Sequence, residues 1–213
     1  MKTVIPPHWW AIDTEGCGTA AKRVIEISLV KMVDLRPTGF IRTWRLDPQG
    51  PISPYAVRVH GIRRSDLDGC PTIQEAAPEI LKSLEDLPIF GHGIGNDLVP
   101  LRRDLPDWKP TAACDTQRLA EVLMPQAASF KLTRIGDALG LTSRARGLTK
   151  AFPHSASFDA ALCGLIAGHL LQKLEPTRAI ELLERTNALR KENPKPFSRQ
   201  HAEQAAAPAP IPG

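Results

Sequence analysis

Two carboxylates, Asp13 and Glu15, stand at the end of a short apolar segment near the start of the chain. Alternate residues of a strand point to the same side, so a strand over 9–14 would project both acids together. Neighbouring carboxylates repel each other unless a positive group lies between them, and a hard cation such as Mg²⁺ or Mn²⁺ meets that need. The alternative is a solvated strand end that binds no metal.

A third acid, Asp97, follows a second strand-like segment over 88–91 and a glycine-rich turn. If the two strands are neighbours in a sheet, Asp97 reaches the same edge as the first pair of acids. The alternative is that Asp97 is an acid in the first turn of a helix, where it favours the helix dipole.

A histidine and a fourth acid, His154 and Asp159, are five residues apart. On one regular helix this spacing separates the two side chains by about 140°, so they could not serve the same site. If Ser155 or Ser157 caps the helix, His154 lies in the preceding loop and can fold back toward Asp159. Pro153 favours that boundary, because the residue before a helix is extended there. The alternative is a loop histidine and a first-turn acid without a shared role.

The segments around these residues predict an antiparallel meander followed by mixed helices and strands in one domain. Thr72 and Glu75 form a capping-box pattern at the start of one predicted helix. The predicted strands cover 9–14, 24–33, 41–46 and 88–91, and the predicted helices cover 73–84, 96–103, 115–123, 131–139, 157–174 and 176–192.

The composition suits a globular α/β protein. The chain has 213 residues, 42% of them hydrophobic, and a net charge of +4 that is compatible with a polyanionic partner. Its apolar runs are shorter than the roughly 20 residues needed to span a bilayer, and the first residues do not resemble a signal peptide. We therefore expect a cytoplasmic protein with no membrane partner. Its four cysteines are scattered, which predicts free thiols rather than a zinc site or disulfides.

The acids and the histidine occur in the order and at the spacing of a known family. From about residue 9 to about residue 174, the chain resembles the 3′→5′ exonucleases whose motifs supply four acids and a histidine, the DEDDh branch. A further stretch over 51–62, with Pro-Ile-Ser-Pro leading to Val-His-Gly-Ile, resembles the loop beside the active site in that family. The matches are Asp13 and Glu15 for the first motif, Asp97 for the second, and His154 with Asp159 for the third.

The resemblance implies a ribonuclease H-like α/β fold, with a mixed five-stranded sheet and helices on both faces. It implies release of nucleoside monophosphates from a DNA or RNA 3′ end, with DNA favoured. Two Mg²⁺ or Mn²⁺ ions would be held by the four acids, His154 would act as the base, and Glu15 would also contact the terminal 3′ hydroxyl. The residues expected to bind substrate are Thr14, His60 and Ile62. A polymerase partner or a homodimer is left open.

The resemblance also defines the expected domains. Residues 1–175 would form the exonuclease domain, 176–192 an additional C-terminal helix, and 193–213 a disordered tail rich in Pro and Ala.

The second motif departs from the family pattern at two positions. Gly93 replaces the usual Asn, and Asn96 replaces the aromatic residue directly before Asp97. The acid is kept, so the change puts substrate preference in doubt. Two alternatives stay open: an RNA-trimming exoribonuclease, and a non-catalytic nucleic-acid-binding or polymerase-associated subunit.

Two groups of basic residues lie near these motifs in the sequence. Arg144, Arg146 and Lys150 are expected in the loop before His154, and a second pair, Arg63 and Arg64, follows His60. Each group would either contact phosphates or form a solvated basic loop.

Overall fold

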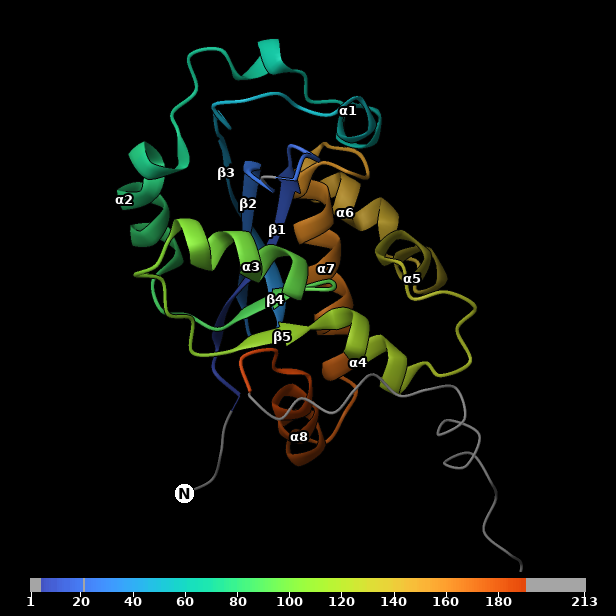
Figure 1. Ribbon diagram of the computed structural model, residues 1–213. Coiled ribbons are helices and arrows are strands. Elements are labelled where there is room, and N and C mark those ends of the chain that lie inside the picture. The colour runs from blue at the N-terminus through green and yellow to red at the C-terminus, as the bar shows by residue number, and fades with distance from the viewer. Residues whose placement is uncertain (1–4, 21, 191–213) are drawn as a thin grey trace, which may run out of the picture.

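A five-stranded sheet forms the centre of the computed structural model, which describes residues 5–20 and 22–190 (Figure 1). The first three strands form the antiparallel meander predicted from the sequence, and the last two run parallel to the first, in the order β3-β2-β1-β4-β5. The strands are β1 (His8–Gly16), β2 (Val24–Val33), β3 (Arg36–Arg45), β4 (Ile89–Gly91) and β5 (Ala113–Asp115). The expected mixed α/β fold with five strands is therefore confirmed.

Helices cover both faces of this sheet, as expected. Helix α7 packs on one face against β1, β2 and β3, while α2 and α3 cover the other face. The helices are α1 (Pro54–His60), α2 (Ile73–Leu84), α3 (Gly95–Asp104), α4 (Thr116–Leu123), α5 (Leu132–Ala138), α6 (Thr142–Thr149), α7 (Ala156–Leu171) and α8 (Pro176–Thr186), with a short 3₁₀ turn, η1 (Arg64–Leu67).

Strand β1 divides its side chains between the two cores. Trp9 and Ala11 pack on the α7 side, and Trp10 and Ile12 pack on the side of α2 and α3. This alternation follows from the two-residue period of a strand. It places the odd-numbered residues of β1, including Asp13, on the same face as α7.

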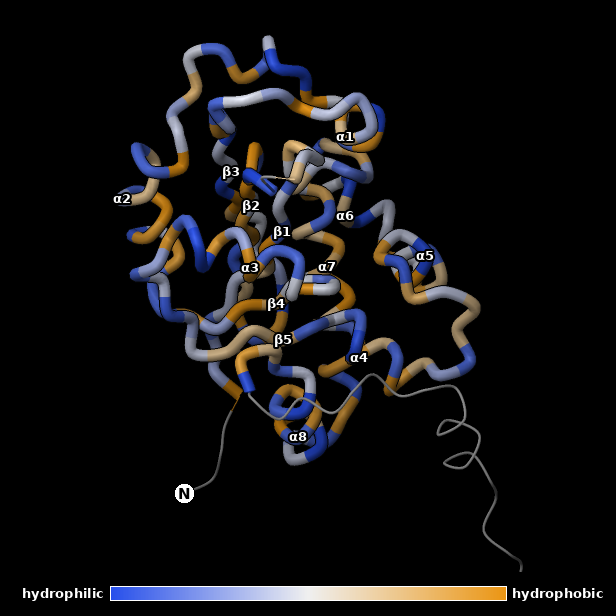
Figure 2. Tube along the Cα trace, viewed as in Figure 1, coloured by the Kyte–Doolittle hydropathy of each residue, from blue (hydrophilic) through white to orange (hydrophobic). Residues whose placement is uncertain are grey.

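Helix α7 is apolar on nearly all sides because it is buried on nearly all sides. It lies on the sheet, while α4, α5 and α6 pack against its outer surface. Figure 2 shows the hydrophobic residues concentrated along α7 and the central strands. Ser155 is the N-cap, and its side chain accepts a hydrogen bond from the Phe158 amide. The helix therefore begins after His154, as the capping interpretation requires.

Several predicted boundaries were wrong. Strand β3 begins at Arg36 rather than at 41, because a tight turn with positive φ at Asp34 and Leu35 brings the chain back at once. Residues 54–60 form a helix where only a loop was expected. The expected helix over 115–123 is preceded by a three-residue strand that the sequence pattern did not reveal.

The loop expected before His154 is largely a helix. Arg144 and Arg146 belong to α6, and Lys150 is the residue that ends it in a left-handed conformation. The helix is short and polar, and Ala145 is its buried contact point. Packing against α7, rather than a strong local pattern, therefore stabilises α6.

Helix α8 ends at Thr186, which is earlier than the expected 192. Asn187 has an extended backbone and pairs with Cys114 of β5. Its side chain accepts a hydrogen bond from the Ala113 amide at 3.0 Å. These bonds to the sheet edge stop the helix. The proposed tail over 193–213 lies outside the described residues, so the assignment of domains stays a prediction.

A close contact joins α7 to the β2–β3 turn. A methyl group at Gly168 would collide with the main-chain carbonyl of Leu35, and Gln172 donates hydrogen bonds to the carbonyls of both turn residues, Asp34 and Leu35. The backbone cannot move away there without breaking these bonds. Gly168 is thus required by close packing.

We predict that Gly168→Ala lowers the free energy of unfolding by about 1–3 kcal/mol, the usual cost of overpacking. Gly147→Ala is the matched control, because nothing surrounds a methyl group at that helical position. It should stabilise the protein by about 0.5–1 kcal/mol. Urea unfolding of both variants measures the difference, and equal stabilities would contradict this account of α7 packing.

Candidate active site

Three carboxylates meet at the end of β1. Asp13 and Glu15 project from the strand toward α7, and Asp159 reaches them from the first turn of that helix. One ligand oxygen from each lies within 4.8 Å of the other two. Asp159 is buried, while the other two acids are half-buried. The structure thus brings together three of the four acids predicted from the sequence.

The fourth acid, Asp97, approaches from α3 and is bonded to the residue between the first two. Its Oδ1 accepts hydrogen bonds from the Thr14 amide at 3.0 Å and from the Thr14 hydroxyl at 2.7 Å. Asp97 is buried, and its charge raises the pKa of Asp13, so it belongs to the same electrostatic cluster. Thr14 therefore fixes Asp97 against β1.

His154 lies in the turn before α7, and its side chain is exposed. Its φ of 66° is in the left-handed region, which is uncommon for a residue other than glycine. Its amide donates a hydrogen bond of 3.3 Å to Oδ2 of Asp159. The structure therefore folds the histidine back toward the acid, as the sequence pattern suggested.

Burial and mutual repulsion shift the acids strongly. Burial, followed by the charges of the neighbouring carboxylates, raises the pKa of Asp13 well above its usual range and that of Glu15 to about 8. Burial also raises the pKa of Asp97 to about 7 and that of Asp159 to about 6. The acids therefore resist carrying four negative charges together.

A divalent cation fits this set of donors. Oδ1 of Asp159 is buried and has no hydrogen-bond partner, which is costly for a carboxylate oxygen. It belongs to a cluster that contains only oxygen donors, the ligands that Mg²⁺ and Mn²⁺ prefer. A bound cation would satisfy the unpaired oxygen and reduce the repulsion.

Two of the four acids, Glu15 and Asp97, open onto a cleft of about 660 Å³ between α1 and α3. Thr14, Glu15, His60 and Asp97 line it, together with exposed apolar side chains on its rim. The apolar residues of the rim are Tyr55 and Val59 from α1 and Val99 from α3. The cleft is therefore polar near the acids and apolar at its mouth.

Two substrate-binding residues expected from the sequence differ in position. His60 lines the cleft, and its Nδ1 accepts a hydrogen bond from the Ile62 amide at 3.0 Å, so the proton of the neutral ring lies on Nε2. Ile62 itself is buried with Cys17, Ile25 and Leu67. Gly61 ends α1 in a left-handed conformation and turns the chain inward. The Ile62 side chain is thus buried in a small apolar cluster, and its contact with substrate stays a prediction.

Glu26 is a further residue of this region that the sequence analysis missed. It lies on β2 directly opposite Glu15, is buried, and adds to the raised pKa values of Asp13 and Glu15. A signal was present, because Glu26 is an acid inside an otherwise apolar strand segment. Its position beside the site depended on the β1–β2 register, which the sequence pattern did not give.

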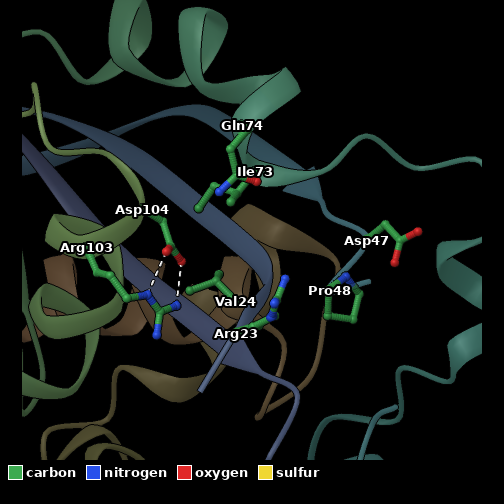
Figure 3. A pocket seen from close by; sticks show the side chains of 8 residues that line it. All are labelled: Arg23, Val24, Asp47, Pro48, Ile73, Gln74, Arg103 and Asp104. Atoms are coloured by element: carbon green, nitrogen blue, oxygen red, sulfur yellow. Dashed lines mark hydrogen bonds and ion pairs between the residues drawn. The ribbon is translucent and has the colours of Figure 1, made fainter. Parts of the chain in front are cut away.

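A second, polar pocket of about 320 Å³ adjoins the cleft at Val24 (Figure 3). Arg103 is bonded there to Asp104, and Asp47 on the opposite wall is bonded to Arg64. The basic pair expected after His60 is thus partly engaged, because Arg64 is held by acids rather than left for a phosphate.

Comparison with known proteins is consistent with this geometry. A sequence model described as exonuclease matches residues 10–166, which contain all four acids and His154. This chain belongs to the exonuclease family. The resemblance to the DEDDh 3′→5′ exonucleases is confirmed at the level of the family.

Individual members of the exonuclease family are similar in part. RNA exonuclease 4 of Cryptococcus neoformans is 29% identical over 114 residues, which cover 49% of this chain and 28% of that protein. The chain therefore spans well under half the length of this relative. Exonuclease X in complex with 5′ overhanging duplex DNA has a TM-score of 0.63 at 21% identity, covering 82% of this chain and 99% of that one. The nuclease domain of 3′hExo, a DEDDh family member, bound to rAMP, has a TM-score of 0.62 at 17% identity, with coverages of 78% and 92%.

The second-motif departures leave the backbone of this exonuclease in place. Gly93 has a φ of 65° and donates its amide to Oδ1 of Asp115 at 2.9 Å. Asn96 is exposed and lines the cleft beside Asp97. The departures therefore change the chemistry of the cleft wall and do not remove the acid. Within residues 5–20 and 22–190, no helix is long and apolar enough to cross a membrane.

The raised pKa values predict how the metal-free protein responds to pH. A folded-state pKa above the unfolded value means that the folded state binds more protons, so the stability from these acids is present below about pH 4.5 and is lost as pH rises toward about 8. Asp13→Asn removes one repelling charge and should reduce this loss.

The difference in melting temperature between wild type and Asp13→Asn, measured in EDTA from pH 5 to 8, tests this effect. The variant should gain in relative melting temperature as pH rises, and Mn²⁺ should stabilise wild type more than the variant. Glu79→Gln, an exposed acid on α2, is the control. A difference that does not change with pH would exclude strong coupling between the acids.

Proposed function

We propose that this chain is a 3′→5′ exonuclease that releases nucleoside monophosphates from the 3′ end of a nucleic acid. The observation that carries the proposal is the meeting of Asp13, Glu15 and Asp159 within 4.8 Å, beside a cleft that Glu15 and Asp97 line. A protein that only binds nucleic acid has no use for buried carboxylates that repel each other and the phosphates. A hydrolase that works with bound cations needs such carboxylates to hold them.

The four acids would hold two Mg²⁺ or Mn²⁺ ions, and Asp13 would be a central ligand because the other three acids lie around it. When bound, such a pair of ions lowers the pKa of the attacking water and stabilises the oxygen that leaves. Thr14 keeps Asp97 in position through its amide and hydroxyl. Each acid thus has a structural reason for its place.

His154 is the proposed general base. Its ring is exposed beside the acids and can take the proton of a water whose oxygen attacks the last phosphorus. The bond from that phosphorus to the O3′ atom of the preceding nucleotide then breaks, and a proton from solvent neutralises O3′. Glu15 lies on the cleft wall, where the terminal 3′ hydroxyl would be held. His60 lines the same wall of the cleft, where a nucleotide would lie.

The substrate strand would extend past α6. Within the described residues, Arg144, Arg146 and Lys150 form no ion pair, whereas several other arginines are held by acids, for example Arg42 by Glu79. Arg146 lies over the exposed ring of Phe152 at 5.1 Å. Arg146 and Lys150 lie nearer the catalytic turn, whereas Arg144 lies toward the other end of α7 with Gly168 and His169, so the three cations suit successive phosphates upstream of the 3′ end.

DNA is the favoured substrate, and RNA is the alternative. Exonuclease X, whose structure is similar to this chain, is described in complex with duplex DNA, whereas RNA exonuclease 4 is named for RNA. The apolar rim around Tyr55 suits a base of either kind. The sugar is the difference that matters, because only RNA offers a 2′ hydroxyl.

Degradation of matched 5′-labelled DNA and RNA oligonucleotides in Mg²⁺ tests the function. Wild type should shorten the strand stepwise from the 3′ end, and His154→Ala should lower the single-turnover rate by roughly 10²–10⁴-fold. The wild-type rate should rise with pH as the His154 imidazole loses its proton, because only the neutral ring can act as a base, and this limb should disappear in the variant.

The outcomes separate the alternatives. Binding without cleavage would identify a non-catalytic subunit, and faster loss of RNA would identify an exoribonuclease. An unaltered pH limb in His154→Ala would remove His154 from the reaction. Unchanged binding of Mn²⁺ by that variant would agree with a base that is not a metal ligand.

The α6 cations give a separate prediction. Arg144→Gln combined with Arg146→Gln should raise KM for a 20-nucleotide strand roughly tenfold at low salt and leave kcat for a dinucleotide unchanged. The salt dependence of binding should fall by about 1.4 in log–log slope, because each phosphate contact on a single strand contributes about 0.7.

Arg178→Gln is the matched control, since Arg178 is paired with Glu181 on the distant helix α8. It removes one surface arginine and should leave KM unchanged. An equal rise in KM for the control would mean that overall charge, rather than α6, attracts the strand.

A further inference from the structure

Glu26 is a buried acid with no assigned role in the chemistry above. Its side chain is 6% exposed, and it stands in register between Glu15 on β1 and Arg45 on β3. Ser28 and Val30, which share its face of β2, lie on the α7 side. Burying a carboxylate is costly unless it is well paired, so the partners of Glu26 explain its presence.

The two oxygens of Glu26 bind two different parts of the protein. Oε1 accepts a hydrogen bond from Nε of Arg45 at 3.2 Å, and Oε2 accepts one from the amide of Ala156 at 3.0 Å. Ala156 is the first residue of α7, whose amide has no acceptor within the helix. The partial positive charge of the helix N-terminus also favours the carboxylate. Glu26 therefore joins the meander to the start of α7.

The start of α7 is the segment that carries His154 and Asp159. Two of its internal hydrogen bonds are long: 3.3 Å from the His154 amide to Asp159, and 3.4 Å from the Phe158 amide to Ser155. These bonds set the shape of the turn, but they do not fix it relative to β1. The left-handed conformation of His154 is strained and persists only where the surroundings hold it.

We propose that Glu26 is a positioning residue that fixes the His154–Asp159 segment against β1. The bond to Ala156 sets the position of the first turn of α7, so that Asp159 meets Asp13 and Glu15. Arg45 holds the other oxygen of Glu26 and balances its charge. The consequence for catalysis rests on the proposed exonuclease function, whereas the anchoring itself does not.

Two substitutions separate position from charge. Glu26→Gln keeps the length of the side chain, but an NH₂ group replaces one of its two carboxylate oxygens. This group cannot accept a hydrogen bond. Glu26→Asp keeps the charge, but it is one methylene too short to reach Ala156 and Arg45 together. Ser28→Ala is the matched control, because it removes a buried 2.7 Å hydrogen bond to Thr43 on the same face of the same strands.

Amide hydrogen exchange of the metal-free protein tests the anchor without any activity. Both Glu26 variants should lose protection at Ala156 by at least about tenfold, while Ser28→Ala should keep it even if it melts at a lower temperature. Retained protection at Ala156 in both Glu26 variants would overturn the proposal.

Metal binding and kinetics test the consequence. Mn²⁺ affinity and the single-turnover rate should each fall by roughly 10–100-fold in both Glu26 variants, the range typical of residues that orient metal ligands. KM for the oligonucleotide should stay within about twofold, because the substrate-binding wall is unchanged. Wild-type behaviour of Glu26→Asp would overturn positioning in favour of negative charge alone. If wild type cleaves no nucleic acid, the proposed function fails, and the exchange and Mn²⁺ measurements still decide the role of Glu26.

Discussion

Mutual repulsion among the carboxylates at the end of β1 is the constraint on which the rest of the site depends. Asp13, Glu15 and Asp159 lie closer together than free acids would tolerate, and Asp97 adds a fourth charge. The free energy that holds them there comes from the two cores on either side of the sheet. A rigid scaffold can keep such a cluster assembled until cations neutralise it, which a flexible loop could not do.

The scaffold meets this constraint through a few close contacts. Helix α7 is buried on nearly every side, so its first turn cannot slide along the sheet. At its far end, Gly168 lets the helix touch the β2–β3 turn. At its near end, Glu26 reaches the first amide of the helix from β2. The two ends together fix where Asp159 stands relative to β1.

The cleft combines rigidly held acids with a variable rim. Thr14 holds Asp97 through two hydrogen bonds regardless of which residue precedes the acid. Asn96 can therefore replace the usual aromatic residue without displacing the acid. The exposed side chains of Tyr55 and Val99 do not hold any of the acids in position. Substitutions at the rim can thus change the preference for one nucleic acid over another while the acids keep their positions.

The sequence by itself determined the features that depend on neighbouring residues. The two-residue period of a strand placed Asp13 and Glu15 on one side, and the capping residue Ser155 put His154 in the turn before α7. The same kind of local signal predicted the meander and the capping box of α2. The order and spacing of the acids were enough to identify the family and its fold.

Only the tertiary structure decided the features that depend on residues far apart in the chain. Strand β5 has three residues, too few for a recognisable pattern, and it is defined by its pairing with β4. Helix α6 is short and polar, and it is stabilised by packing against α7. The bond from Glu26 to Ala156 joins residues 130 positions apart. Local rules act over a few residues, whereas contacts at this separation are selected by the packing of the whole chain, and that is why the position of the anchor could not be predicted.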